Sequence, residues 1–295
     1  MAEPENPAPG VGQLQAPGLG VFDRDTAVHL LNGSESASVF AAEVSPHWRA
    51  GRGPHGGYLA AMMLRALSEA VGDPARAPRS LTVHYARAPE PGPVTIRTVT
   101  ERAGRSLSTL SGRMERDGSL VALALAAFSV PWSGPEIGEL RPPDVAPPDA
   151  ARQSRIPVHP AAPSFTRHLV MQPRIEAQPF TAIPGPMDFT AWLGLAQPRE
   201  IDALSLAFFS DALLPAVFMR LTEPSVVPTV DLTVHFRAAL PRSAERDPEE
   251  LCLARMQSRV IHEGFFEEDG VIWAPDGQVL AQSRQLGLVL PRRNS

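Results

Sequence analysis

The sequence predicts an α+β fold made of two tandem units, in each of which an antiparallel sheet wraps around a central helix. Three observations predict it: a strand motif that occurs twice, an apolar helix ahead of each copy, and a hairpin signal after each copy. A long-range repeat is considered first because it determines the whole architecture. We place the two units at residues 19–132 and 165–291.

The repeated motif is Leu-Thr-Val-His followed by an aromatic residue. It stands at 81–85 and again at 232–236, and an arginine and a proline follow each copy within a few residues. Alternation of apolar and polar residues is typical of a half-buried strand. Five matching residues alone would prove little, but the elements around them repeat in the same order.

A short strand and an apolar segment precede each copy of the motif. The strands are predicted at 38–48 and 189–195, and the apolar segments at 59–67 and 204–214. After each motif, Gly104 or Gly264 marks a turn, and an Asp-Gly pair then gives a strong hairpin signal. Each hairpin leads into a long apolar strand, predicted at 120–130 and 279–290.

The first apolar segment predicts a buried helix. From Tyr58 to Leu67 the chain is apolar on nearly every side except at Arg65. A helix that is apolar all round is buried rather than amphipathic. The sheet is the only other element in each half, so it should enfold the helix. That is the hot-dog arrangement, and two copies predict a double hot dog whose two sheets join edge to edge.

Two segments fall outside the repeated units. Nine prolines occur from Pro131 to Pro163, so residues 133–164 are predicted to form an extended linker over the surface. Residues 1–18 are predicted to be a disordered tail.

Composition excludes several classes of protein. A net charge of -5 argues against a nucleic-acid surface, which needs an excess of basic residues. No apolar run approaches the roughly 20 residues of a membrane-spanning helix, and the N-terminus has no signal-peptide pattern. A single cysteine, Cys252, is too few for a disulfide or a zinc cluster. We therefore expect a cytoplasmic protein without a metal or cofactor.

Three motifs in the second half carry a resemblance to a known family. Ser210-Asp211-Ala-Leu-Leu-Pro, Pro-Thr229-Val-Asp231 and Leu-Ala-Gln-Ser-Arg-Gln285 resemble the acyl-CoA thioesterase II family of double hot-dog enzymes. In the first half, Gly-Pro-His55-Gly-Gly and Gly-Arg-Ser at 104–106 resemble the same family's first repeat. The resemblance spans residues of both halves, from about 20 to 290.

The resemblance implies a set of catalytic residues. In that family an aspartate, a threonine and a glutamine hold a water against the thioester carbonyl, and the matching positions are Asp211, Thr229 and Gln285. After the Thr-x-Asp sequence the chain departs from better-known members, which carry His-Ser-x-Trp-Phe-His there. The departure affects the expected substrate more than the expected reaction.

All three residues can also be interpreted without the resemblance. Asp211 interrupts an apolar run, where an ionised carboxylate is costly unless it is paired, and this suits a general base. The alternative is that Asp211 caps a second short helix from Ala212. Gln285 and Gln282 must point to opposite faces of their strand, so only one can face a site. The alternative for Gln285 is an exposed glutamine on an edge strand, and the alternative for Thr229 is an ordinary strand threonine.

The first helix begins with His55, Gly56 and Gly57. Two glycines leave backbone N–H groups unshielded at the positive end of the helix, where an oxyanion or a thioester carbonyl could bind. Equally, glycine would let the sheet approach the helix closely. By itself His55 is more often a polar loop residue than a catalyst.

The preferred function is hydrolysis of an acyl-CoA thioester by water. No Gly-x-Ser-x-Gly sequence is present, so a covalent serine mechanism is not supported. A hot-dog dehydratase or hydratase that uses His55 or His159 is one alternative, and a non-catalytic acyl-CoA-binding protein is another. We expect an acyl-CoA partner and a homodimer or larger assembly.

Overall fold

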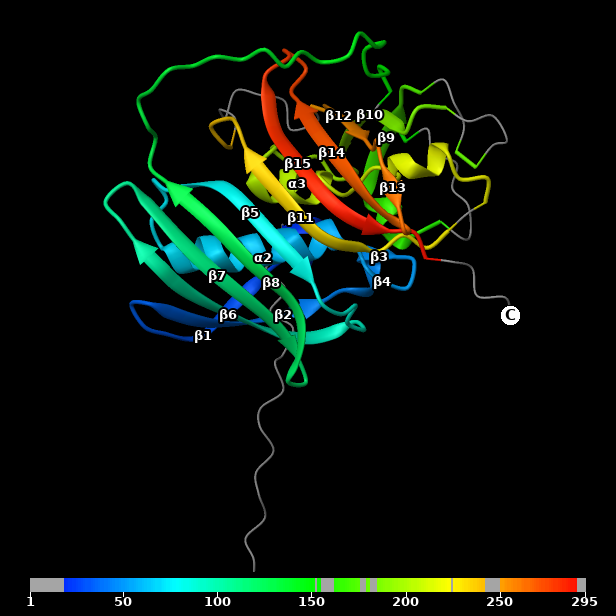
Figure 1. Ribbon diagram of the computed structural model, residues 1–295. Coiled ribbons are helices and arrows are strands. Elements are labelled where there is room, and N and C mark those ends of the chain that lie inside the picture. The colour runs from blue at the N-terminus through cyan, green and yellow to red at the C-terminus, as the bar shows by residue number, and fades with distance from the viewer. Residues whose placement is uncertain are drawn as a thin grey trace, which may run out of the picture.

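The computed structural model describes residues 19–151, 153–154, 162–175, 179–180, 185–223, 225–241 and 250–290. In this part of the chain, a 13-stranded antiparallel sheet curves around helices that lie behind it in Figure 1. The predicted tail, residues 1–18, and His159 lie outside the described residues.

The N-terminal half contains two helices and a series of strands. In chain order its elements are α1 (Val21–Asp25), β1 (Val28–Gly33), β2 (Ala37–Val44), η1 (Pro46–Trp48), β3 (Arg49–Ala50), β4 (Gly53–Pro54), α2 (Gly56–Val71), β5 (Ala77–Tyr85), β6 (Gly92–Ala103), β7 (Leu107–Arg116) and β8 (Ser119–Ser129).

The C-terminal half repeats this order with a shorter helix. Its elements are η2 (Ser164–His168), β9 (Leu169–Pro173), β10 (Asp188–Leu195), α3 (Ala203–Phe209), η3 (Ala216–Met219), β11 (Thr229–Phe236), β12 (Cys252–Gln257), β13 (Ile261–His262), β14 (Phe265–Trp273) and β15 (Val279–Leu288).

The two halves join through the repeated motif itself. The strand order is β1-β2-β6-β7-β8-β5-β11-β15-β14-β12-β10-β9, so β5 and β11 pair at the centre of the sheet. At this junction Thr82 lies opposite Thr233, and the two hydroxyl oxygens are 3.0 Å apart. A local twofold axis therefore passes between these threonines. The edge-to-edge double hot dog predicted from the sequence is confirmed.

Helix α2 fills the core of the first half. Its side chains are buried from Tyr58 to Leu64, including Met62 and Met63 at 0% exposure. A Cβ at Gly112 of β7 would lie 2.9 Å from the Met63 Cε atom, so the sheet passes directly over the helix. The helix ends at Gly72, whose φ of 63° is the left-handed conformation that glycine adopts without strain. It is a buried helix, as predicted, but longer than the apolar segment.

Helix α3 is shorter than predicted, because it ends at Phe209 and not near residue 214. A capping box between Asp202 and Ser205 begins it. At its end, Pro215 cannot follow in a helix, since a proline ring clashes with the carbonyl four residues earlier, here that of Asp211. The chain instead turns at 210–211, and the next helical turn starts at Ala216. Asp211 therefore does not cap a helix from Ala212.

The proline-rich segment passes along the C-terminal half as an extended chain (Figure 1). Of the predicted linker, residues 133–151, 153–154 and 162–163 have no helix or strand, and Ser164 begins η2. Side chains of the second sheet hold the linker: the Trp192 Nε1 donates to the Ala146 carbonyl at 2.9 Å, and Arg174 donates to the Pro147 carbonyl at 2.6 Å. Among the helices of the described residues, none has the length and apolarity to cross a membrane.

Candidate active site

Asp211 contacts the start of the helix that belongs to the other half. Its Oδ2 accepts a hydrogen bond from the Gly57 N–H at 2.8 Å, across 154 positions of sequence. The N-terminal end of a helix carries a partial positive charge that stabilises a carboxylate. The break after α3 thus places Asp211 where it caps α2, and the site is assembled from both halves.

His55, the residue before α2, also holds Asp211 in place. Its Nδ1 accepts from the Tyr58 N–H at 3.3 Å, so Nε2 carries the hydrogen and donates to the Asp211 carbonyl at 2.9 Å. Burial lowers the pKa of His55, although the Asp211 charge opposes this effect. His55 is therefore neutral, with both ring nitrogens engaged.

The two glycines allow this close contact. A Cβ at Gly56 would lie 2.8 Å from the Asp211 Oδ2, and a Cβ at Gly57 would lie 2.6 Å from the Phe208 carbonyl oxygen. Both distances are shorter than a Cβ tolerates, so side chains here would push α3 and Asp211 away. This favours a steric explanation of the glycines, but the element that approaches is the end of α3 and not the sheet. Asp211 occupies the N–H of Gly57. Gly56 is half-buried, and its N–H at the start of the helix is the neighbouring donor for an oxyanion.

Thr229 and Gln285 lie beside Asp211, so the structure brings the three predicted residues together. The Thr229 hydroxyl donates to the Gln285 Oε1 at 2.9 Å, and its oxygen is 3.5 Å from the Asp211 Oδ1. Gln285 is 5% exposed, in a strand that lies between β11 and β14. It is not an exposed glutamine on an edge strand. As expected from their spacing, Gln282 points to the other face, where it accepts from Arg237.

Glu268 completes this group, and the sequence analysis missed it. Its Oε1 accepts from the Gln285 Nε2 at 2.6 Å, and its Oε2 accepts from the Ala216 N–H at 2.6 Å. Burial, helped by the Asp211 charge, raises the pKa of Glu268 to about 7.

A signal for Glu268 was present in the sequence. The run Glu267-Glu268-Asp269 suggests a solvated surface, but strand alternation places Glu268 on the same face as Phe266 and Gly270. All three are buried in the structure. An acidic residue in register with inward-facing residues is the pattern that would have indicated it.

The N-terminal half has no equivalent set. The local twofold axis relates Leu232 to Leu81. Leu232 pairs with Gln285, whereas Leu81 pairs with Ala126. Extending the same register to β7 and to the start of β5, the counterparts of Gln285, Glu268 and Thr229 are Ala126, Leu110 and Pro78. Only one polar site is therefore built for the two helices.

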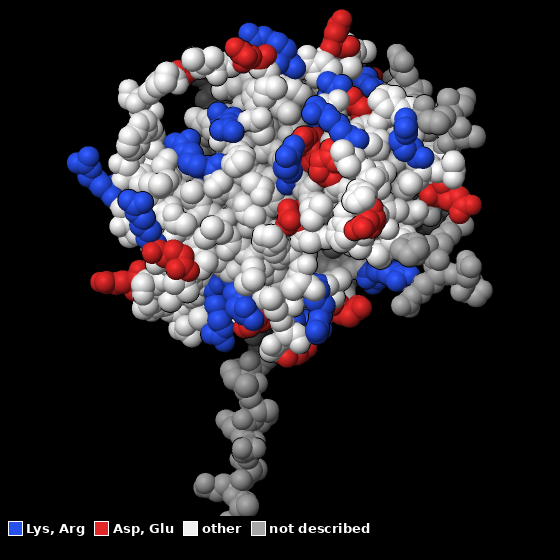
Figure 2. Space-filling view, in the orientation of Figure 1, with Lys and Arg blue, Asp and Glu red and all other residues white. Residues whose placement is uncertain are grey.

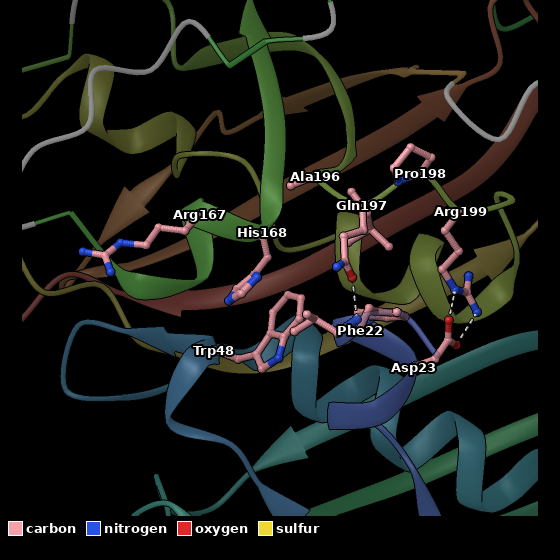
Figure 3. A pocket seen from close by; sticks show the side chains of 12 residues that line it. Phe22, Asp23, Trp48, Arg167, His168, Ala196, Gln197, Pro198 and Arg199 are labelled. Carbon is pink, nitrogen blue, oxygen red and sulfur yellow. Dashed lines mark hydrogen bonds and ion pairs between the residues drawn. The ribbon is translucent and has the colours of Figure 1, made fainter. Parts of the chain in front are cut away.

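The start of α3 is closed by ion pairs instead. Arg199 donates to Asp23 of α1 at 2.8 Å, as Figure 3 shows. It also donates to Asp202, the cap of α3, at 2.8 Å. A hollow of about 200 Å³ lies beside Arg199 and Asp23, and the buried Trp48 also lines it. None of Asp211, Thr229, Gln285 and Glu268 borders this hollow.

Comparison with known families identifies both halves. A profile of the acyl-CoA thioesterase C-terminal domain matches residues 141–289, and a profile of the acyl-CoA thioesterase N-terminal domain matches residues 44–129. The chain belongs to the acyl-CoA thioesterase family. The family recognised from its motifs is confirmed, and with it the enzyme class, an acyl-CoA thioesterase.

Solved structures agree on the fold of this thioesterase. A hot-dog protein of unknown function from Alicyclobacillus acidocaldarius is 28% identical, with a TM-score of 0.78 and coverage of 93% of this chain and 100% of that one. A putative thioesterase II from Thermobifida fusca is 24% identical, with a TM-score of 0.76 and coverage of 93% and 99%. The acyl-CoA thioesterase II TesB2 from Mycobacterium marinum is 18% identical, with a TM-score of 0.72 and coverage of 93% and 100%.

A similar sequence also occurs among mycobacterial proteins. An uncharacterised protein of Mycobacterium tuberculosis is 26% identical to this thioesterase over 287 residues, which covers 87% of this chain and 93% of the relative.

Proposed function

We propose that this thioesterase hydrolyses acyl-CoA by direct attack of water, with Asp211 as the general base. The observation that supports it is the contact of Asp211 with Thr229, which in turn is hydrogen-bonded to Gln285, at the start of a buried helix. Water adds to the thioester carbonyl and loses a proton to Asp211. The carbon–sulfur bond then breaks, and the proton passes to the leaving thiolate of coenzyme A. A positioned base contributes typically about 10²- to 10⁴-fold in rate.

The carbonyl oxygen needs hydrogen-bond donors as charge develops on it. We assign the Gly56 N–H to this role, because it lies at the positive end of α2 next to Asp211. His55 and Gly57 act indirectly in this scheme, since their hydrogen bonds hold Asp211 beside Gly56. Loss of one such donor typically costs about 10²- to 10³-fold in kcat.

The contacts of other reactive groups disfavour the alternatives. A dehydratase would need a histidine free to exchange protons, and both ring nitrogens of His55 are hydrogen-bonded. Covalent catalysis by Cys252 is disfavoured because burial raises the pKa of its thiol to about 12. A pure binding protein would have no need for a half-buried carboxylate and hydroxyl aligned with a buried amide in this order.

The test is thiol release from a panel of acyl-CoA esters, from acetyl to palmitoyl and including an aromatic ester. We expect at least one ester to release coenzyme A at a rate proportional to enzyme concentration. The heat-denatured protein is the control. Absence of release from every ester, with acyl-CoA binding retained in calorimetry, would contradict hydrolysis and support the binding protein.

We also propose that the enzyme is a homodimer or larger. Leu123 and Leu125 on the outer face of β8 are 41% and 51% exposed, and Val99 on β6 is 42% exposed. Figure 2 shows a wide uncharged area over the strands of the N-terminal half. An apolar area of this kind is typical of a protein–protein interface. Light scattering should give a multiple of 31.7 kDa, and Leu125→Arg should shift it toward the monomer. A monomeric wild type would contradict the proposal.

A further inference from the structure

Glu268 is the buried first member of a series of contacts that runs through Gln285 and Thr229 to Asp211. It is 3% exposed and receives one hydrogen bond on each carboxylate oxygen, from Gln285 and from the Ala216 N–H. The charged groups that act on it are Asp211 and, from the opposite face of β14, Glu267. It does not contact the place where water would attack, so any effect on the reaction must pass through Gln285.

The direction of each hydrogen bond in this series follows from Glu268. An ionised carboxylate only accepts hydrogen bonds, so Gln285 must turn its NH₂ group toward Glu268. The amide oxygen of Gln285 then faces Thr229 and accepts the hydrogen of its hydroxyl. As a result, the Thr229 oxygen has free lone pairs on the side of Asp211, and no hydrogen to donate there.

We propose that Glu268 is a positioning residue, which fixes this order and so keeps the Thr229 oxygen able to accept a hydrogen from the attacking water. The proposal rests on the water mechanism above. A water has two hydrogens, and its oxygen lone pair points at the thioester only if both hydrogens are held. Asp211 takes one as the base, and Thr229, 3.5 Å from Asp211, holds the other.

Protonation of Glu268 reverses the direction of the hydrogen bonds that link it through Gln285 and Thr229 to Asp211. With a hydrogen on Oε1, Glu268 donates to the Gln285 oxygen, and the amide turns over to donate its NH₂ to Thr229. The Thr229 hydroxyl then donates to Asp211 and competes with the water for the base. Since burial brings the pKa of Glu268 to about 7, with Asp211 and Glu267 adding to the effect, this reversal occurs as the pH falls through neutrality.

The experiment compares Glu268→Gln, Glu268→Asp and the control Glu267→Gln. A glutamine at 268 can accept from Ala216 and donate to Gln285, which imposes the reversed order at every pH. We expect kcat to fall roughly 10- to 100-fold with little change in KM, as for misplacement of a reacting group. The decline of wild-type kcat below about pH 7 should be absent in Glu268→Gln and retained in Glu268→Asp. Glu267 is half-buried, accepts from backbone N–H groups of Arg259 and Val260, and makes the smallest contribution to the raised pKa of Glu268. Its variant should therefore keep the wild-type kcat above about pH 8 and the decline of kcat at lower pH.

A second readout does not depend on turnover. The side-chain NH₂ resonances of Gln285, measured by NMR with the variants as assignment aids, should titrate near pH 7 in the wild type and stay constant in Glu268→Gln. Wild-type kcat in a folded Glu268→Gln variant would overturn the proposal. If the wild type hydrolyses no ester, the proposed function fails, and the NMR titration alone decides: a Gln285 signal unchanged across pH 5–9 would overturn the proposed order of hydrogen bonds.

Discussion

Replacement of Asp211 by asparagine is expected to lower kcat for thioester hydrolysis by about 10²- to 10⁴-fold, the usual contribution of a general base. An amide cannot take the proton from water, but its oxygen can still accept from the Gly57 N–H, so the cap of α2 is preserved. The folded structure and KM should therefore change much less than kcat. Thiol release under saturating substrate measures the effect.

The matched control for this substitution is Asp269→Asn. Asp269 lies in β14 next to Glu268, but it points outward and pairs with Arg284 at 2.6 Å on the surface. Exposed ion pairs contribute little to stability, so this variant should keep both its fold and its kcat. If folded Asp211→Asn hydrolyses the ester at the wild-type rate, the proposed reaction stands but Asp211 is not its general base.

Glu268→Gln is expected to stabilise the protein at high pH while it slows the reaction. An acid whose pKa rises on folding binds its proton more tightly in the folded state, so its ionisation destabilises that state. For Glu268, with a pKa raised from 4.5 to about 7, the penalty is complete above about pH 7 and disappears below pH 4.5. The shift corresponds to about 3 kcal/mol in the free energy of unfolding.

Urea unfolding of the wild type and Glu268→Gln at pH 4.5, 6 and 8.5 tests this effect. The free energies of unfolding should be close at the lowest pH and should separate as the pH rises, with the variant more stable. Glu267→Gln should give no such separation. A variant that is less stable than the wild type at pH 8.5 would mean that Glu268 is held in its ionised form by favourable contacts. A functional residue that lowers stability is a common cost of an active site.

Much of the fold could be predicted because the repeat is visible in local sequence. The motif at 81–85 and 232–236 indicates two equivalent strands, and Asp-Gly pairs mark the hairpins that follow them. The length of α3 could not be predicted from apolar content, since residues 212–214 are apolar but not helical. Their path is determined by Pro215 and by the hydrogen bond from His55, which comes from the other half.

The site was predictable only in part. Asp211, Thr229 and Gln285 were found through family motifs, and their contacts confirm that they lie together. The partner of Asp211 on α2 depends on how the two halves dock, which no local pattern reports. Glu268 was hidden for a different reason, since its acidic neighbours give the run a surface composition although strand alternation turns it inward.

The two halves that meet where β5 pairs with β11 belong to one chain, so their sequences are free to differ. In an assembly of two separate copies, every group at one helix start must recur at the other. Here the halves are covalently tied, so one start carries Asp211 beside Gly57, and the other is closed by Arg199 between two aspartates. A buried carboxylate such as Glu268 therefore occurs once in the sheet, with Leu110 as its counterpart, and its destabilising effect is not doubled. Loss of symmetry is what makes such a site tolerable in a protein of this size.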